Sequence, residues 1–185
     1  MPIEVISEIL SNHKNKPFLL VDAAQSFGQI PINKAAAKAD IYAFTGHKWA
    51  FGPEGLGGVI LSERVLQESK PTLIGWKSIA KEESIYSHNP NPFHPDARRF
   101  EIATSCTPLL AGLRCSMDLL NKEGNEMERI KKIKSLSQQL WENLSTINDL
   151  HLILKGPPPS GIISFNVKSK FNPAEIVKSL GQESI

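Results

Sequence analysis

The sequence predicts an α/β fold with parallel strands, followed by a partial α+β domain. In the first half, short apolar runs typical of buried parallel strands alternate with short helical patterns. The second half has two long amphipathic patterns, then two short strands and a third helix, which indicates an α+β arrangement. We therefore expect a first domain over residues 1–106 and a second over 107–185.

The first half begins with an expected helix at 3–10, where isoleucines recur at helical spacing. Strands are expected at 18–25, 41–44 and 56–61. The run at 18–25 is continuously apolar and is typical of a strand buried on both faces. Asn33 is a candidate cap for a short helix. The segment 77–99 is rich in Pro, Asn and His, and we expect a long loop there.

The second half begins with a helix near Pro108, which suits a first helical turn, and Gly124 fits its C-terminal end. A second long helix is expected to turn one apolar stripe inward, with its three lysines facing water. The stripe is Met127, Ile130, Ile133, Leu136, Leu140, Leu144 and Ile147. Strands at 150–154 and 162–167 and a helix at about 173–180 complete the pattern.

Composition excludes several classes of function. The net charge of +2 is too small to indicate nucleic acid or an anionic membrane as a partner. Apolar runs fall short of the roughly 18 residues that span a bilayer. Two cysteines cannot form a disulfide framework or a zinc site, so we expect no metal and a cytoplasmic protein. Cys106 and Cys115 are expected to be buried thiols.

Polar residues follow two neighbouring strands, at the edge where ligands bind in open α/β sheets. They are Asp22, Gln25, Thr45, His47 and Lys48. This is the set that a pyridoxal 5'-phosphate (PLP) site needs: an amine for a Schiff base, a carboxylate for the pyridine nitrogen and donors for the phenolic oxygen and phosphate. Each element alone also fits a helix cap, a surface turn or an ordinary hairpin.

The order and spacing of three motifs resemble the cofactor-lysine region of class-V PLP enzymes. These motifs are D-A-A-Q, T-G-H-K-W and G-P-E-G-L-G-G, and the later R-R-F-E-I-A-T is similar to a second motif of that family. Cysteine desulfurases and cysteine/cystine lyases belong to it, and the lyase branch is the most similar. The resemblance implies the second half of a PLP-transferase (aspartate aminotransferase-like) large domain, followed by a partial small domain.

The resemblance also implies a role for each site residue. Asp22 pairs with the pyridine nitrogen, Gln25 contacts the phenolic oxygen, and Lys48 binds the cofactor covalently and moves protons. Thr45 and His47 contact the phosphate. Thr104 reaches the phosphate of a second subunit, so a homodimer or higher homo-oligomer is implied, with cysteine or cystine as substrate. Arg99, Glu101 and Trp49 are expected to be structural.

Members of this family are about twice as long as this chain, so we expect a fragment with weak activity or none. It would lack the ring-stacking aromatic residue and the arginine that holds the substrate carboxylate. Two alternatives stay open. One is a catalytically dead remnant that acts as an oligomerisation or interaction module. The other is a phosphate-binding α/β protein unrelated to PLP, although no P-loop or dinucleotide fingerprint is present.

Overall fold

The computed structural model describes residues 1–80, 92–168 and 172–185. The chain forms two compact units, Met1–Glu126 and Met127–Ile185, and each is described by itself. The division expected from the sequence, 1–106 and 107–185, stays a prediction. None of the helices in the described ranges is long and apolar enough to cross a membrane.

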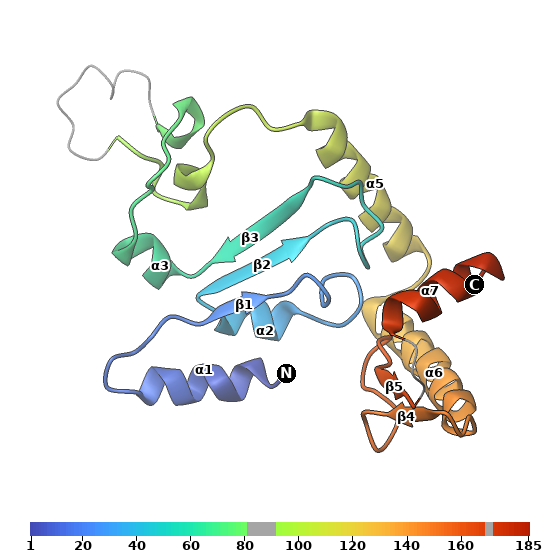
Figure 1. The fold of residues 1–185 in the computed structure, drawn as a ribbon. Helices are drawn as coiled ribbons and strands as arrows, with labels where there is room; N and C mark the ends of the chain where they lie inside the picture. Colours follow the sequence, from blue (N-terminus) through green and yellow to red (C-terminus); the bar gives the residue numbers. More distant parts are fainter. Residues whose placement is uncertain (81–91, 169–171) are drawn as a thin grey trace. The chain divides into compact units, whose positions relative to one another are not determined.

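The first unit is built on a three-stranded sheet in the order β1-β2-β3 (Figure 1). Strand β1 (Leu20–Asp22) pairs in parallel with β2 (Ile41–Thr45), as the sequence predicts. Strand β3 (Gly57–Leu61) pairs antiparallel with β2, so the expectation of an all-parallel sheet was wrong. The reason is the short connection from β2 to β3. It contains no helix, and a crossover to a parallel strand needs one or an equally long path.

One face of this sheet carries the core of the unit. Helix α2 (Asn33–Lys38) packs there against Tyr42, which is 2% exposed, and against the fully buried Ala23. Helix α1 (Ile3–Asn12) contacts α2 in turn. Asn33 is the first residue of α2 and its side chain makes no cap, so the predicted capping role was wrong.

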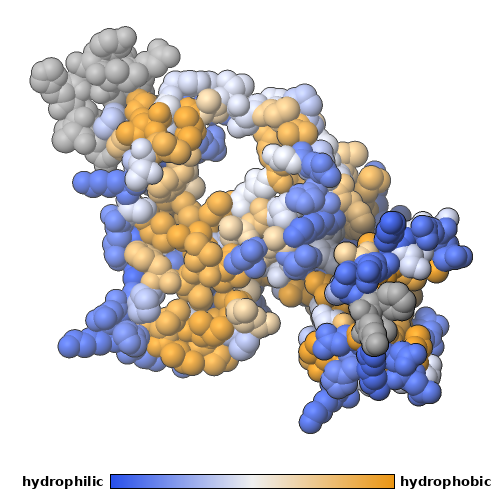
Figure 2. Space-filling view, viewed as in Figure 1, coloured by the Kyte–Doolittle hydropathy of each residue, from blue (hydrophilic) through white to orange (hydrophobic). Residues whose placement is uncertain are grey.

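The opposite face of the sheet is largely open. Strand register puts Leu20, Ile41, Ala43 and Val59 on this face, and Leu20 and Val59 are 63% and 53% exposed. Figure 2 shows apolar surface over the region of these strands. The prediction that β1 is buried on both faces was therefore wrong, because β1 is an edge strand with one covered face.

Beyond the sheet, helix α3 (Glu63–Glu68) is followed by two short 3-10 helices, η1 (Trp76–Ser78) and η2 (Ala97–Phe100). These occupy the ends of the predicted loop at 77–99, and the rest of that loop lies largely outside the described residues. Arg99 ties this region together. Its guanidinium donates to the carbonyl oxygens of His94, Pro95 and Leu66 at 2.8–2.9 Å.

Helix α5 (Thr107–Lys122) packs on the loop between β2 and β3. Ser116 Oγ donates to the carbonyl oxygen of Phe51 at 2.8 Å, and a Leu113 methyl group fills the space beside Gly52. Gly124 follows the helix with φ +135°, which fits the predicted helix end. Cys106 and Cys115 are both exposed, so the prediction of buried thiols was wrong. Both lie on parts of α5 and its N-terminus that no other element covers.

The second unit contains α6 (Glu126–Ser145), an antiparallel pair of β4 (Leu150–Leu152) and β5 (Phe165–Val167), and α7 (Pro173–Gln182). These elements match the predicted order. The inward stripe of α6 was predicted only in part. Ile130 is 5% exposed, whereas Leu136 and Leu140 are 57% and 51% exposed. Met127, in the first turn of α6, and Ile147, which follows the helix, are also exposed.

Candidate active site

Two of the predicted site residues lie at the same end of the sheet. Asp22 is the last residue of β1 and Thr45 is the last residue of β2. Because β1 and β2 are parallel, with Asp22 opposite Ala43, both strands end at this edge. Strand alternation assigns Asp22 and Thr45 to the same side of the sheet, since Asp22 lies opposite Ala43 and Thr45 is two residues further along β2. The Asp22 carboxylate is exposed, not buried as predicted, and its Oδ1 accepts from the backbone N–H of Ala24 at 2.9 Å.

His47 and Lys48 lie in a tight loop directly after β2, and both are exposed. Backbone hydrogen bonds close this loop. Gly52 N donates to Gly46 O at 2.8 Å, and Phe51 N donates to Lys48 O at 3.2 Å. A Cβ at Gly52 would lie 2.6 Å from Leu113 and 2.9 Å from Gly46 O, so only glycine fits there. The lysine is therefore presented to solvent by a backbone whose conformation is fixed.

The turn that follows β1 is pressed against the Lys48 loop. Gly28 adopts φ +86°, and a Cβ there would lie 2.5 Å from the carbonyl carbon and oxygen of Trp49. Such a close approach requires glycine. A side-chain hydrogen bond between Ser26 and Tyr42 also ties this turn to β2. Burial raises the pKa of the Tyr42 hydroxyl above its usual range, and the bond with Ser26 offsets part of that effect.

Two side-chain hydrogen bonds organise the polar groups of the site. The indole Nε1 of Trp49 donates to Gln25 Oε1 at 2.9 Å. Thr45 Oγ1 and His47 Nδ1 lie 2.5 Å apart. When the hydroxyl donates to Nδ1, the imidazole carries its proton on Nε2, on the other side of the ring. From the sequence we expected Trp49 to be structural. The hydrogen bond between Trp49 and Gln25 was not predicted, because the two residues are 24 positions apart.

Thr104 is the one predicted site residue that lies outside β1, β2 and the loops that directly follow them. It is exposed in the segment between η2 and α5, and no hydrogen bond joins it to the other five residues, all of which are described. Its neighbour Ser105 accepts from Lys77 Nζ at 3.3 Å. Arg99 has the structural role that the sequence predicts, and Glu101 lies 3.8 Å from Lys77 in an ion pair.

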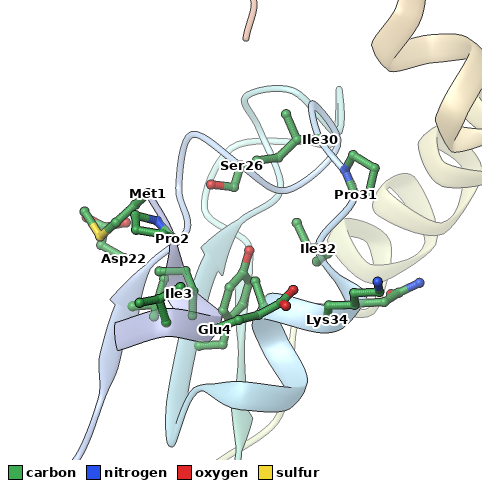
Figure 3. Close-up of a pocket in the computed structure, with 15 residues that line it drawn as sticks. Met1, Pro2, Ile3, Glu4, Asp22, Ser26, Ile30, Pro31, Ile32 and Lys34 are labelled. Carbon is green, nitrogen blue, oxygen red and sulfur yellow. The ribbon is translucent and has the colours of Figure 1, made fainter. Parts of the chain in front are cut away.

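A hollow of about 690 Å³ opens beside Asp22, between α1, α2 and the turn after β1 (Figure 3). Ile3, Ile30 and Ile32 line it with apolar side chains, and Glu4 and Lys34 lie at its lower side in the figure. Of the six predicted site residues, Asp22 alone is among its lining residues. The hollow therefore meets the sheet edge at Asp22, and Lys48 does not line it.

The described donors and acceptors match the chemical needs of PLP. The edge offers an exposed primary amine, a carboxylate, a carboxamide, and a hydroxyl paired with an imidazole. An amine can bond to an aldehyde, and the other groups can meet a ring nitrogen, a phenolic oxygen and a phosphate. Among the described residues, no group of three or more His, Cys, Asp or Glu is arranged to hold a metal ion.

Comparison with known proteins gives the same family throughout. The model of the class-V aminotransferase family matches residues 1–185. A probable cysteine desulfurase of Mycolicibacterium paratuberculosis is 31% identical over 189 residues, which cover 100% of this chain and 26% of that protein. One of Methanothermobacter thermautotrophicus is 32% identical over 167 residues, which cover 88% and 39%.

Solved structures extend the likeness to three dimensions. The cystine C-S lyase C-DES, in complex with its reaction product cysteine persulfide, aligns with a TM-score of 0.90 at 34% identity, over 100% of this chain and 48% of that one. In a second structure of C-DES, glycine is covalently linked to the PLP cofactor. A cysteine desulfurase of Thermococcus onnurineus aligns with a TM-score of 0.70 at 25% identity, over 99% and 44%.

The chain thus spans between about a quarter and a half of the length of these relatives. Within that span the family model covers every residue, including D-A-A-Q, T-G-H-K-W and R-R-F-E-I-A-T. The chain belongs to the class-V aminotransferase family, and it is similar to the cysteine desulfurases and the cystine lyase C-DES over part of their length.

Proposed function

We propose that this chain carries the lysine-bearing part of a PLP site that acts on the C–S bond of cysteine or cystine. One observation carries the proposal. Because β1 and β2 run parallel, their last residues, Asp22 and Thr45, lie at the same edge of the sheet. The loop that carries Lys48 follows β2 directly. The family uses PLP, and the C-DES complex with cysteine persulfide supports the choice of substrate.

Each polar group has a task in this proposal. Lys48 supplies the amine that holds the cofactor aldehyde. Because its side chain is exposed, a ligand can reach this amine from solvent. Asp22 keeps its Oδ2 for a charge-assisted hydrogen bond to the pyridine nitrogen, since Oδ1 already accepts from Ala24. Thr45 and His47 contact the phosphate, and His47 donates from Nε2 when the Thr45 hydroxyl donates to Nδ1. Bound PLP supplies an electron sink for the substrate carbon that carries the amino group.

Protons at the site are moved by this chain's own groups. With PLP bound and the Lys48 amine unattached, that amine would accept a proton from the substrate carbon that carries the amino group, or return one to it. The fixed backbone of its loop limits where that amine can reach. This restriction matters because a well-oriented group can remove about 7–11 kcal/mol from a barrier.

Association of the chain with itself is part of the proposal. The open face of the sheet exposes Leu20 and Val59, and the outer edges of β1 and β3 pair with no other strand among the described residues. Such faces and edges favour contact with another chain. Thr104, which the fold leaves away from Lys48, is exposed and available to reach the phosphate in a second subunit.

The open face also favours a second candidate function, an interaction module without catalysis. Apolar surface of this kind would serve a binding role whether or not Lys48 reacts. The two functions differ in one simple observable. A lysine-bound PLP absorbs near the edge of the visible range, whereas an interaction module stays colourless.

The test is chemical fixation of the cofactor. The chain is incubated with PLP, reduced with borohydride, digested and analysed by mass spectrometry. We expect the label on the peptide with Lys48, and we expect Lys48→Ala to remove both label and absorbance. Lys34 and Lys77 serve as internal controls, because both are lysines of the same unit that lie outside the loop following β2. A label on either of them, with none on Lys48, refutes the proposal.

A further inference from the structure

The contact between Trp49 and Gln25 determines how the Gln25 amide is turned. An indole N–H can only donate a hydrogen bond, so the amide atom that faces it, 2.9 Å away, must be the oxygen. This holds even though oxygen and nitrogen of an amide are easily interchanged when assigned from shape alone. The NH₂ group of Gln25 therefore points away from the indole. It is free to donate, since the carboxamide is exposed.

The backbone holds both partners in place. Gly28 lies against the Trp49 carbonyl with no room for a Cβ, which fixes the turn containing Gln25 relative to the Lys48 loop. The next residue, Ala50, is 1% exposed, and Trp49 is half-buried. The contact thus joins two segments that are already packed together, so little conformational entropy is lost when it forms.

We propose that Trp49 is a positioning residue that presents the Gln25 NH₂ as a hydrogen-bond donor to an anionic oxygen of the ligand held by Lys48. The proposal rests on the proposed function and identifies what controls one of its contacts. Without the indole N–H, the amide is free to rotate by half a turn. Its oxygen would then face the ligand for part of the time and repel the negative charge that the NH₂ attracts.

A pair of matched substitutions isolates this effect. Trp49→Phe keeps an aromatic ring in the packing but removes the indole N–H together with one of the two fused rings. Trp141→Phe is the control, because its indole donates to the Leu154 carbonyl at 3.4 Å within the second unit and has no part in the Gln25 contact. Any general consequence of replacing a tryptophan should appear in both variants. An effect on the Gln25 amide should appear in the first alone.

The first measurement needs no cofactor. In ¹H–¹⁵N spectra of the chain, the indole signal that disappears in Trp49→Phe is that of Trp49. In Gln25→Ala, we expect this signal to shift and its exchange with water to become at least about twofold faster, since the acceptor is gone. The indole signal of Trp141 should not change. A Trp49 signal that is identical in wild type and Gln25→Ala overturns the proposal.

The second measurement follows the visible absorbance of bound PLP against pH. A donor to the anionic oxygen stabilises the less protonated form, so its loss should raise the midpoint of the titration, by about 0.5–1 pH unit in Trp49→Phe. Trp141→Phe should keep the wild-type midpoint. An unshifted midpoint in Trp49→Phe overturns the proposal. If wild type gains no absorbance with PLP, the proposed function fails, and the indole measurement then decides the positioning role alone.

Discussion

Replacing Gly28 by alanine tests whether the turn after β1 is held against the Lys48 loop as closely as the structure shows. The new Cβ would lie 2.5 Å from the carbonyl carbon and oxygen of Trp49 and 2.6 Å from Ala50 N. All three are backbone atoms, so no side-chain rotation relieves the overlap. The residue would also keep φ near +86°.

The two contributions can be estimated separately. A left-handed conformation costs an ordinary L-residue about 1–2 kcal/mol. Forcing a methyl group into filled space typically costs about 1–3 kcal/mol more. We therefore expect Gly28→Ala to lower the free energy of unfolding by about 2–5 kcal/mol.

Gly55→Ala is the matched control. Gly55 has nearly the same backbone angle, φ +82°, but its Cβ would meet only a Leu109 methyl group at an ordinary 3.7 Å. It should therefore show the conformational cost of about 1–2 kcal/mol without the overlap. Both free energies come from urea unfolding followed by tryptophan fluorescence. Equal losses in the two variants would show that the Gly28 turn is not pressed against Trp49.

Three further predictions concern the site, a surface ion pair and association. Asp22→Asn should weaken PLP binding about tenfold or more, because a charge-assisted hydrogen bond is replaced by a neutral one, and absorbance titration measures this; an unchanged affinity would show that Asp22 is only a turn residue. The pKa of the Asp96 carboxyl is lowered to about 2, chiefly by its hydrogen bond from Arg98. The stabilisation from this pair is therefore present above the ordinary aspartate pKa and is lost as the pH falls towards 2. In Arg98→Ala the pKa of Asp96, followed by NMR, should rise towards its usual range, because only the backbone hydrogen bond from residue 98 remains. Val59→Lys, on the open sheet face, should reduce self-association in light scattering, whereas substitution of another exposed valine, Val177→Lys on α7, should not; equal effects would argue against association through the sheet.

Local signals in the sequence predicted where β1 and β2 lie and where each of them ends. The apolar run before Asp22 ends where β1 ends, and the short run before Thr45 ends with β2. Both strands were recognised because a buried strand and its first polar residue are neighbours in sequence. The same local logic predicted α5 and its end near Gly124.

Features that depend on distant partners could not be predicted in this way. The direction of β3 is decided by which edge of β2 it reaches, and a short apolar run such as that at 57–61 looks the same in either direction. Exposure of Leu136 and Leu140 depends on how much of α6 another element covers, which the helical period does not report. The contact between Trp49 and Gln25 joins two motifs whose spacing carries no sign of it.

The attachment made by Arg99 has a consequence for how the protein responds to its surroundings. The acceptors that meet its guanidinium are backbone carbonyl oxygens of His94, Pro95 and Leu66, which carry no net charge and do not titrate. Acid that protonates carboxylates leaves these acceptors unchanged, and salt has no opposing charge to screen. The segment that leads to Thr104 should therefore stay attached to α3 at low pH or high salt. The same conditions weaken ion pairs such as that between Asp96 and Arg98.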